Sequence, residues 1–559
     1  MKELNNAIRK HALLNAIEHE GTANPQAVLG KLIAEDPELR KDIQKIMKDI
    51  QAVVKEVNLL SLQKQKEVAE DLGAKKVEKK VREPEELSDL PNAVKGKVVM
   101  RLAPYPSGPL HIGNARMVIL NDEYVKRYKG KLFLVIDDTI GSEEKFVLKD
   151  GYEMILDGLK WLGVRYHKKF YKSDRLKYFY KFAEELIRKE LAYVCECESD
   201  VLRKNRLEGT ECEHRSQGAK TNLKKWKMML SGKFGEGKAA LRLKTDMKDP
   251  NPAFRDRVLL RIVERKHPRV GTKYRVWPLL EFSWAVDDHL LGITHVLRGK
   301  DLVMEDLMEK YIWKKLGWNS TVFIHYGLLN VEEAKSKISK SEARRNIESG
   351  IYSGWDDPRT WSLQSLRRRG IQPEAVRQFI LNMGMSEADV TVPAEILYSE
   401  NRKIIDKKAN RYFAVLNPEI IEIVNASKKK VATPPLHPDF PRRGRRKIPV
   451  NGSKVFIERE DLQKFSNQNV GLINLFSVKL GKKAEFVSDE IRFEDQKLHW
   501  VSEPNVKIRI VMPDGSAREG IGEPGMAKLK EGELIQLVRI GFCRVDKVNK
   551  GIVLYYAHK

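Results

Sequence analysis

Apolar residues recur every three to four positions in the first part of the chain, for example in AIRKHALLNAI and IQKIMKDIQAVVKEV. This spacing places the apolar side chains on one face of a helix. A charged, proline-bearing stretch, AKKVEKKVREPEELSDLPN, then interrupts the pattern and is typical of a linker. The sequence therefore predicts a helical appended domain at 1–73 and a linker at 74–94.

The pattern changes at residue 95, where short apolar runs alternate with amphipathic ones. Strands are predicted for KVVMRLA and GKLFLVIDD, and helices for HIGNARMVILNDEYVKRY and DGYEMILDGLKWLG. Such alternation is the pattern of a parallel α/β sheet, here in two halves at 95–190 and 273–330. A basic, cysteine-containing stretch at 191–272 separates the halves, 331–415 is helical, and 416–559 has short alternating strands that suggest one or two β-barrels.

Length and composition exclude several classes of protein. With 559 residues and 42% hydrophobic content, the chain is long and apolar enough for several folded domains. No apolar run approaches the ~18 residues of a membrane span, and the first residues show no secretory signal. Four cysteines are too few for a disulfide scaffold, so we expect a cytoplasmic protein without membrane contact.

The charge is strongly positive. Lys and Arg number 103 against 78 Asp and Glu, which gives 103 − 78 = +25. A solvated, thermophile-like surface rich in lysine and glutamate is one explanation. An excess of this size favours a polyanionic partner, and nucleic acid is the preferred interpretation.

The stretch PYPSGPLHIGNAR, residues 104–116, joins a predicted strand to a predicted helix. Free N–H groups at a helix start favour an anion, glycines allow close approach, and His111 can donate to a phosphate oxygen. The G-x-G-x-x-G of dinucleotide-binding folds is absent. On its own, the stretch fits an ordinary strand-to-helix turn equally well.

A second polar stretch, SKISKSE, contains Lys337, Ser339 and Lys340. By itself it is typical of a solvated loop. It follows the second half of the α/β pattern, however, so its lysines could reach the same phosphates from the other side.

These two stretches resemble the HIGH and KMSKS motifs of class I aminoacyl-tRNA synthetases. Three flanking phrases, RLAPYPSGPLHIGNAR, VDDHLLGITHVLRGKD and GWDDPRTWSLQSLRRRG, resemble the glutamyl- and glutaminyl-tRNA synthetases. The last phrase and the β-rich C-terminal region are similar to the archaeal and eukaryotic glutamyl type and to the glutaminyl enzymes. The resemblance covers the chain from residue 95 onward.

The resemblance implies a multidomain α/β fold. Its parts are a Rossmann-like catalytic domain, an acceptor-binding insertion, a helical connecting domain with the KISKS loop, and C-terminal β-barrel anticodon-binding domains. The implied activity is that of a glutamate–tRNA ligase, which forms glutamyl-adenylate from L-glutamate and ATP and charges tRNA(Glu). The resemblance leaves open whether tRNA(Gln) is charged too, and we expect a monomer. A glutaminyl-tRNA synthetase and an inactive tRNA-binding paralogue remain alternatives.

The resemblance also assigns the ATP-binding residues. His111 and Asn114 would donate hydrogen bonds to ATP from the helix start, and Gly113 would let the adenosine lie on the backbone. Lys337, Ser339 and Lys340 would neutralise the triphosphate, with Mg²⁺ accompanying ATP. His111, Lys337 and Lys340 are the expected catalytic residues.

For the amino acid, Arg101 matches the family arginine that meets the substrate side chain. Asp137 matches the acidic residue that holds the α-amino group, and Arg298 matches a further pocket arginine of the glutamyl enzymes. Other positions depart from the family.

Tyr105, Leu280 and Trp284 are unusual at pocket positions, and IDDTIG replaces the common EDTDP. Buried packing is the alternative interpretation of Leu280 and Trp284. These departures leave the predicted ATP chemistry unchanged and concern amino-acid recognition.

Two further sites are predicted. Cys195, Cys197, Cys212 and His214 form a C-x-C…C-x-H set that suits a closed, structural zinc site, the alternative being scattered reduced thiols. The resemblance agrees, since some glutamyl enzymes have such a zinc element. In the basic stretch PRRGRRK, Arg446 best matches an arginine that reads an anticodon base, the alternative being a solvated loop.

Overall fold

The computed structural model describes residues 2–18, 21–36, 39, 42–72, 87–142, 146–333, 340–425, 429–450, 453–492 and 495–559. The chain divides into two compact units, Met1–Glu83 and Pro84–Lys559. Within the described residues, no helix combines the length and apolar character needed to cross a membrane.

The first unit is helical, as its apolar spacing predicts. Its helices bury one apolar face each, and Ile8, Leu13 and Ile50 are among its fully buried residues. The buried Gln65 ties the helices together, because its amide donates to the carbonyl oxygens of Gly21 and Val57, both at 2.9 Å. The helices are α1 (Lys2–Glu18), α2 (Pro25–Glu35), α3 (Ile43–Asn58) and α4 (Leu62–Asp71).

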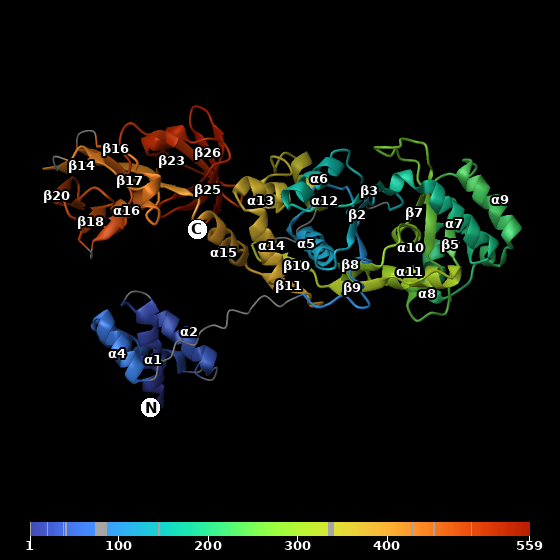
Figure 1. Ribbon diagram of the computed structural model, residues 1–559, viewed down its shortest axis with the longest axis horizontal. Helices are drawn as coiled ribbons and strands as arrows, with labels where there is room; N and C mark the ends of the chain where they lie inside the picture. Colours follow the sequence, from blue (N-terminus) through green and yellow to red (C-terminus); the bar gives the residue numbers. More distant parts are fainter. Residues whose placement is uncertain are drawn as a thin grey trace. The chain divides into compact units, whose positions relative to one another are not determined.

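A parallel sheet begins the second unit (Figure 1). Strands pair in parallel in the order β1-β2-β3, and β8 pairs in parallel with β9. Thr294 joins the two groups, since its N–H donates to the Val99 oxygen at 2.9 Å. The strands are β1 (Val99–Leu102), β2 (Lys131–Ile136), β3 (Lys168–Tyr171), β8 (His295–Gly299) and β9 (Val322–Tyr326).

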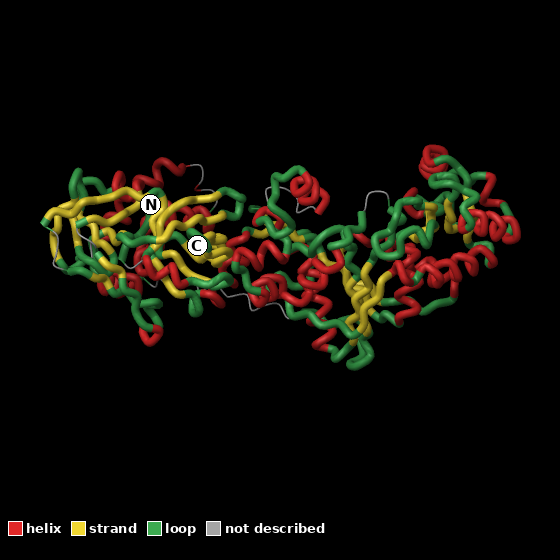
Figure 2. Tube along the Cα trace, turned by 90° about the horizontal axis from the view of Figure 1, so that it is seen from above, coloured by secondary structure: helices red, strands yellow, loops and turns green. Residues whose placement is uncertain are grey.

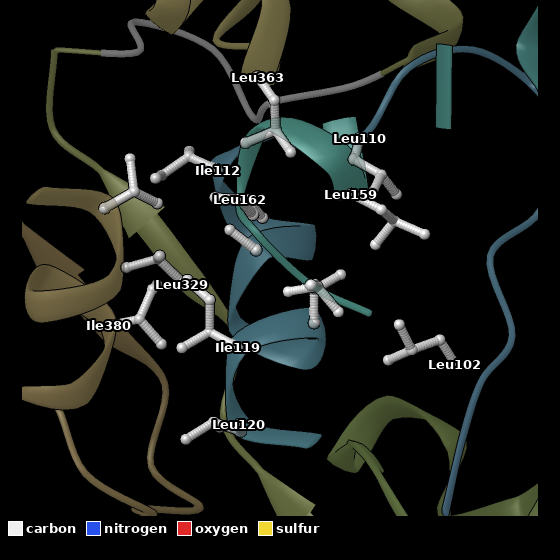
Figure 3. Packing of buried hydrophobic residues seen from close by; sticks show 14 of the residues in the cluster. Leu102, Leu110, Ile112, Ile119, Leu120, Leu159, Leu162, Leu329, Leu363 and Ile380 are labelled. Atoms are coloured by element: carbon white, nitrogen blue, oxygen red, sulfur yellow. The ribbon is translucent and has the colours of Figure 1, made fainter. Parts of the chain in front are cut away.

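Helices cover this sheet and form its core. Figure 3 shows Leu110, Ile112 and Ile119 gathered around one helix, with Leu363 and Ile380 packed against it from the later part of the chain. The apolar residues that lead into and out of His111 are therefore anchored in the core. The helices are α5 (Ile112–Arg127), α6 (Gly151–Trp161), α10 (Leu280–Leu291) and α11 (Val303–Leu316).

The chain between the two halves of the sheet forms a separate antiparallel sheet. Its order is β4-β5-β6-β7, and the buried Trp226 and Trp277 belong to the core beside it. The elements are α7 (Leu176–Arg188), β4 (Ala192–Cys195), α8 (Ser199–Glu208), α9 (Ala219–Leu230), β5 (Ala240–Leu243), β6 (Val258–Ile262) and β7 (Val276–Pro278).

The following part is mainly helical and returns to the sheet. Helix α14 packs against α5 and α15, and β10 pairs in parallel with β11. The elements are β10 (Leu329–Val331), α12 (Lys340–Glu348), α13 (Leu363–Arg369), α14 (Pro373–Leu381), β11 (Val390–Val392) and α15 (Ala394–Ile405).

Strands dominate the C-terminal part, drawn orange to red in Figure 1 and mostly yellow in Figure 2. The strand order is β12-β24-β25-β26-β22-β23-β13 in a seven-stranded sheet and β17-β14-β20-β19-β18-β21 in a six-stranded one. The strands β12 and β13 lie next to each other in the chain and edge the sheet whose other strands come last, so the two sheets are interleaved along the sequence.

The elements of this part are β12 (Asn410–Tyr412), β13 (Ala414–Leu416), β14 (Pro418–Val424), β15 (Val431–Ala432), β16 (Ile448–Pro449), β17 (Lys454–Glu458), α16 (Arg459–Lys464), β18 (Asn469–Leu472), β19 (Ser477–Lys479), β20 (Ala484–Ser488), β21 (Gln496–Leu498), β22 (Val506–Val511), β23 (Ala517–Gly522), β24 (Leu534–Leu537), β25 (Gly541–Val548) and β26 (Ile552–His558). The predicted fold class, a multidomain α/β protein with N-terminal helices and barrel-like C-terminal sheets, is confirmed.

Candidate active site

His111 caps the helix that follows the first strand. The ring atom Nδ1 of His111 accepts a hydrogen bond from the backbone N–H of Gly113 at 3.2 Å. The backbone N–H of His111 donates to Oδ1 of Asn114 at 3.3 Å. A Cβ atom on Gly113 would lie 3.0 Å from Cε1 of His111, so a side chain at this position would crowd the imidazole ring. The predicted ATP-binding residues His111, Gly113 and Asn114 thus form one capping unit at the start of α5.

The protonation state of His111 follows from this geometry. Burial, together with the nearby charge of Lys340, lowers the pKa of His111 to about 3, so the imidazole is neutral at neutral pH. Because Nδ1 accepts, the ring proton is on Nε2, which leaves a neutral N–H donor beside a helix N-terminus. Such a place suits an anion.

The predicted loop of lysines is partly described. Lys340 begins α12, and its charge acts on His111 although 340 − 111 = 229 residues separate the two. Lys337 and Ser339 lie outside the described residues. The structure therefore brings one of the two predicted loop lysines toward His111.

The phrase GWDDPRTWS holds the His111 loop from the other side. The Ile112 N–H donates to the Trp361 oxygen at 3.1 Å, and the Leu363 N–H donates to the Leu110 oxygen at 2.8 Å. Gly108 has φ +151°, and a Cβ there would lie 2.8 Å from the Trp355 ring. Two phrases far apart in the sequence thus meet at the strand-to-helix turn.

The residues predicted to bind the amino acid, Arg101, Asp137 and Arg298, form a second part of the site, called the amino-acid end below. Here three cations surround one indole. The guanidinium carbon of Arg101, the Nζ of Lys172 and the guanidinium carbon of Arg298 lie 4.9, 5.0 and 4.7 Å from the ring centroid of Trp284. Arg101 is on β1, Lys172 directly follows β3, Arg298 is on β8, and Trp284 is on α10. The structure therefore gathers the predicted Arg101 and Arg298 around a residue that the sequence analysis set apart as unusual.

Both arginines are engaged by carboxylates of the chain. Arg101 forms a bidentate pair with Asp288 at 2.6 and 2.8 Å, and both side chains are buried. Arg298 donates to Asp306 at 2.6 Å and to Glu309 at 2.8 Å. Burial raises the pKa of Glu309 to about 8, with Arg298 opposing the shift. Burial therefore favours the protonated form of the Glu309 carboxyl group, and Asp306 is the second carboxyl group that accepts from Arg298.

Asp137 also has a partner within the chain. The ammonium of Lys172 lies 3.2 Å from Oδ2 of Asp137 and 2.6 Å from the hydroxyl oxygen of Ser283, and Lys172 is fully buried. Burial lowers the pKa of Lys172, and Asp137 opposes this shift. Sequence reasoning missed Lys172, although a lysine at the end of the strand KFY is a signal that could have identified it.

The remaining unusual positions differ in exposure. Leu280 lines a groove of about 870 Å³ rather than the core. Trp284 is buried, with only 5% of its surface exposed. Burial raises the pKa of Tyr105, which stays neutral. The groove is also lined by four arginines and by one predicted metal ligand, namely Arg203, Arg206, Arg257, Arg261 and Cys197.

The four predicted metal ligands lie together, with their ligand atoms within 4.8 Å of one another. The Cys195–Cys212 Sγ distance is 3.8 Å, and Nδ1 of His214 is 4.0 and 3.5 Å from the Sγ atoms of Cys195 and Cys197. A tetrahedral zinc ion with Zn–S of ~2.3 Å and Zn–N of ~2.0 Å requires about 3.8 Å between two sulfur ligands and about 3.5 Å between a sulfur and a nitrogen ligand. The donor set and its spacing therefore fit such an ion.

A buried arginine supports this cluster. Nη1 of Arg242 lies 3.6 Å from Sγ of Cys195 and 3.8 Å from Sγ of Cys212. Nε of Arg242 donates to the backbone carbonyl oxygen of Asp256 at 2.9 Å. A cation at this distance favours the thiolate form that binds a metal.

Arg446 is not presented to solvent. It pairs with Glu523 at 2.7 Å, and its Nη1 donates to the Pro435 oxygen at 2.7 Å, which leaves 6% of the residue exposed. Burial lowers the pKa of Arg446, and Glu523 opposes this shift. The exposed cations of this stretch are its neighbours, Arg442, Arg443, Arg445 and Lys447.

Comparisons with known proteins show the family of the chain. The family model described as tRNA synthetases class I (E and Q), catalytic domain, matches residues 97–407, and two models for the anti-codon binding domain match 409–496 and 493–546. The chain belongs to this family of class I tRNA synthetases. The resemblance carried by the sequence motifs is confirmed.

Full-length relatives support the same assignment. A glutamate–tRNA ligase of Pyrococcus furiosus is 43% identical over 573 residues, covering 98% of this chain and 99% of that one. One from Methanothermobacter thermautotrophicus is 41% identical and covers 100% of both chains. A solved glutamate tRNA ligase from Elizabethkingia meningosepticum has a TM-score of 0.41 at 19% identity, over 56% of this chain and 70% of that one, a likeness too weak to bear on the fold.

Proposed function

We propose that this chain is a glutamate–tRNA ligase. It would form glutamyl-adenylate from L-glutamate and ATP, release pyrophosphate, and transfer the glutamyl group to the 3′ end of tRNA(Glu). The relatives of full length carry this name. The observation that carries the proposal is the neutral Nε2–H donor of His111 at the start of α5, with the charge of Lys340 acting on it.

Catalysis in this proposal is placement and charge stabilisation rather than covalent chemistry. The glutamate α-carboxylate attacks the α-phosphorus of ATP, and negative charge grows on the phosphate oxygens. His111, Asn114 and Gly113 would meet ATP at the helix start. Lys337, Ser339 and Lys340 would neutralise the triphosphate, and Mg²⁺ would accompany ATP.

The amino-acid end would hold glutamate through its charged groups. Arg101 and Arg298 supply positive charge, and Asp137 would receive the α-amino group. In the structure, charged side chains of the chain itself make these contacts: Lys172 donates to Asp137, and Asp288 accepts from Arg101. Glutamate binding therefore has to exchange contacts with at least one of these partners.

The tRNA would lie along two basic surfaces. The groove lined by arginines next to Leu280 suits the single-stranded 3′ end. In PRRGRRK, the exposed neighbours of Arg446 suit phosphates, while buried Arg446 would position the stretch that reads an anticodon base. The aminoacylation assay described below also tests whether tRNA(Gln) is charged.

Zinc is the metal that best fits Cys195, Cys197, Cys212 and His214, because soft thiolate and imidazole ligands in tetrahedral spacing favour it. All four positions are protein ligands, so the ion would brace the insertion structurally. Metal analysis of the Cys195→Ser variant should show about one zinc per chain fewer than the wild type. Undiminished metal in that variant would reject the site.

The domain assignment is part of the proposal. Residues 95–190 and 273–330 would form the catalytic domain, 191–272 the acceptor-binding insertion, 331–415 the connecting domain and 416–559 the anticodon-binding domains, following the helical domain at 1–73 and the linker at 74–94. We also propose a monomer in the cytoplasm.

Aminoacylation tests the function directly. The full chain is assayed with labelled glutamate and glutamine on tRNA(Glu) and tRNA(Gln). Charging of tRNA(Glu) with glutamate is the expected result, and glutamate on tRNA(Gln) would show a broader acceptor range. Charging with glutamine only would identify a glutaminyl enzyme. Binding of tRNA without charging would identify an inactive paralogue.

A further inference from the structure

Helix α8 lines the groove next to Leu280, yet none of its ten residues is buried. Arg203 and Arg206 of this helix line the groove, and Leu207 is 64% exposed. A helix of this length is marginally stable by itself in water. The position of α8 therefore depends on contacts at its two ends.

The loop before β6 holds the end of α8. Nη1 of Arg255 donates to the backbone oxygens of Arg206 and Leu207 at 2.8 and 2.9 Å, which satisfies carbonyl groups that a helix end leaves free. Nη2 of Arg206 donates to the backbone oxygens of Pro252 and Ala253, both at 3.1 Å. The end of α8 and this loop are thus fixed together.

The start of α8 adjoins the metal cluster. Cys197 lies two residues before Ser199, the first residue of α8, and its Sγ is one of the four predicted ligand atoms. Cys197 also lines the groove. A metal ion bound to Cys197 would fix the point at which the chain enters α8.

Asp256, at the end of the loop that holds α8, connects this loop to the other ligands. Its buried carboxylate accepts from the Tyr193 hydroxyl at 2.8 Å and from Nε of Arg215 at 2.9 Å. Tyr193 lies two residues before Cys195, and Arg215 directly follows His214. One carboxylate therefore joins two ligand-bearing segments to the loop.

The backbone of Asp256 is held in an unusual conformation. Its φ is +34°, which non-glycine residues seldom adopt, and such a conformation persists only where surrounding contacts determine it. Thr245 supplies two of these contacts, because its N–H donates to Oδ1 of Asp256 and its Oγ1 accepts from the Asp256 N–H, both at 2.7 Å. The Asp256 carbonyl oxygen accepts from Arg242, which lies beside Cys195 and Cys212. The carboxylate and the carbonyl group of Asp256 thus both lead back to the metal ligands.

We propose that Asp256 is a positioning residue that transmits metal binding to α8, so that the bound ion orders one wall of the groove. With metal, Cys197 fixes the start of α8, and Asp256 fixes the loop at its end. The ligand of the groove, the single-stranded 3′ end of tRNA, rests on the proposed function, whereas the link from the metal to α8 does not.

The first test compares the metal affinity of Asp256→Asn with that of the wild-type full chain. Asparagine has nearly the same shape and tolerates this φ, but it turns an N–H₂ group toward the donors of Tyr193 and Arg215. Metal is removed with a chelator and Co²⁺ is titrated back, because Co²⁺–thiolate complexes absorb visible light. Loss of a contact that orients the ligands predicts about tenfold to hundredfold weaker binding.

Asp246→Asn is the matched control. Asp246 belongs to the same connection between β5 and β6, but it is exposed, and its Oδ1 accepts from the Lys248 N–H at 2.7 Å. The Co²⁺ affinity of this variant should equal that of the wild type. Arg215→Gln, which removes one donor to Asp256, replaces Asp256→Asn if the latter does not fold, and its Co²⁺ affinity should fall in the same direction.

The second test follows α8 itself. Trypsin cleavage after Arg203 and Lys204 is measured by mass spectrometry with and without saturating Zn²⁺. Cleavage of the wild type should be at least about tenfold slower with Zn²⁺, because local opening of α8 then works against the bound ion. Asp256→Asn should gain less protection even at saturation, whereas a merely structural role would leave this ratio unchanged.

The groove is tested with a minihelix that carries the single-stranded 3′ end of tRNA(Glu). Its affinity for the wild type, measured by filter binding, should fall by about tenfold when Zn²⁺ is removed, because the metal and the RNA favour the same ordered α8.

Equal Co²⁺ affinity of Asp256→Asn and the wild type would overturn the inference, as would an unchanged protection ratio or a minihelix affinity that does not depend on Zn²⁺. A wild type that binds no metal would overturn it as well. Charging of tRNA(Glu) by the wild type reports separately on the proposed function, so an inactive wild type whose α8 is still protected by metal contradicts that function alone.

Discussion

The two ends of the candidate active site are built in different ways. At the ATP end, His111, Gly113 and Asn114 are adjacent in sequence and are fixed by a helix cap and the backbone of the 361–363 segment. At the amino-acid end, charges from β1, β8, α10 and the residue that follows β3 meet around Trp284 and pair with one another. The first end is fixed by neighbouring residues and by one later segment, whereas the second is assembled from several distant segments whose charges pair with one another.

This difference separates stability from chemistry. Substitutions at the ATP end remove groups that serve a ligand and few that hold the fold. Substitutions among the buried ions leave a partner charge unpaired inside the protein, which is costly. The two ends should therefore respond to mutation in different measurements.

The largest expected effect is on stability at the amino-acid end. Asp288→Asn leaves the buried guanidinium of Arg101 without its counter-charge, which costs about 3–5 kcal/mol. Urea unfolding monitored by circular dichroism measures this change. Asp157→Asn is the control, because its pair with Arg367 is 40% and 44% exposed and should contribute about 1 kcal/mol or less. If the free energy of unfolding falls by a similar amount in the two variants, the buried pair contributes no more to stability than the exposed pair.

The next effect is on activity at the ATP end. His111→Ala removes the Nε2–H donor and should lower the rate of ATP–pyrophosphate exchange with tRNA present by about 10²-fold, as for loss of one donor to a developing anion. Affinity for tRNA, measured by filter binding, should stay unchanged. An unchanged exchange rate would remove His111 from the chemistry.

A pH dependence distinguishes the amino-acid end further. The pKa of Glu309 is raised to about 8 in the folded protein, so the folded state holds this proton more tightly than the unfolded state. The free energy of unfolding should therefore fall as pH rises from the ordinary glutamate pKa, about 4.5, toward about 8. Glu309→Gln cannot titrate and should lack this part of the decline, as urea unfolding at several pH values would show. Parallel profiles would contradict the buried, protonated state.

The smallest effect concerns the cap itself. Asn114→Ala removes the acceptor of the His111 N–H and should reduce the free energy of unfolding by about 1 kcal/mol. Exchange activity should fall less than in His111→Ala if Asn114 mainly positions the loop. A loss as large as that of His111→Ala would instead give the Asn114 amide a direct role on ATP.

The two ends also differ in what the sequence could predict. The strand, the turn and the helix around His111 follow from local pattern, since capping and glycine requirements act within a few residues. The pairing of Arg101 with Asp288, or of Lys172 with Asp137, joins positions 187 and 35 residues apart. Such pairs depend on how the strands assemble, and the residues next to the arginine, the lysine or either carboxylate do not indicate its partner. The sequence likewise predicts that Arg446 reads an anticodon base. Its partner in the structure, Glu523, lies far along the chain, so the neighbours of Arg446 do not indicate this pair.

Glutamate-dependent ATP–pyrophosphate exchange by the wild-type full chain, with tRNA(Glu) present, tests the central claim most directly. The account predicts exchange with glutamate that is at least about tenfold faster than with glutamine, because Arg101 and Arg298 are proposed to supply positive charge for a carboxylate. No exchange with glutamate, or a preference for glutamine, would contradict it.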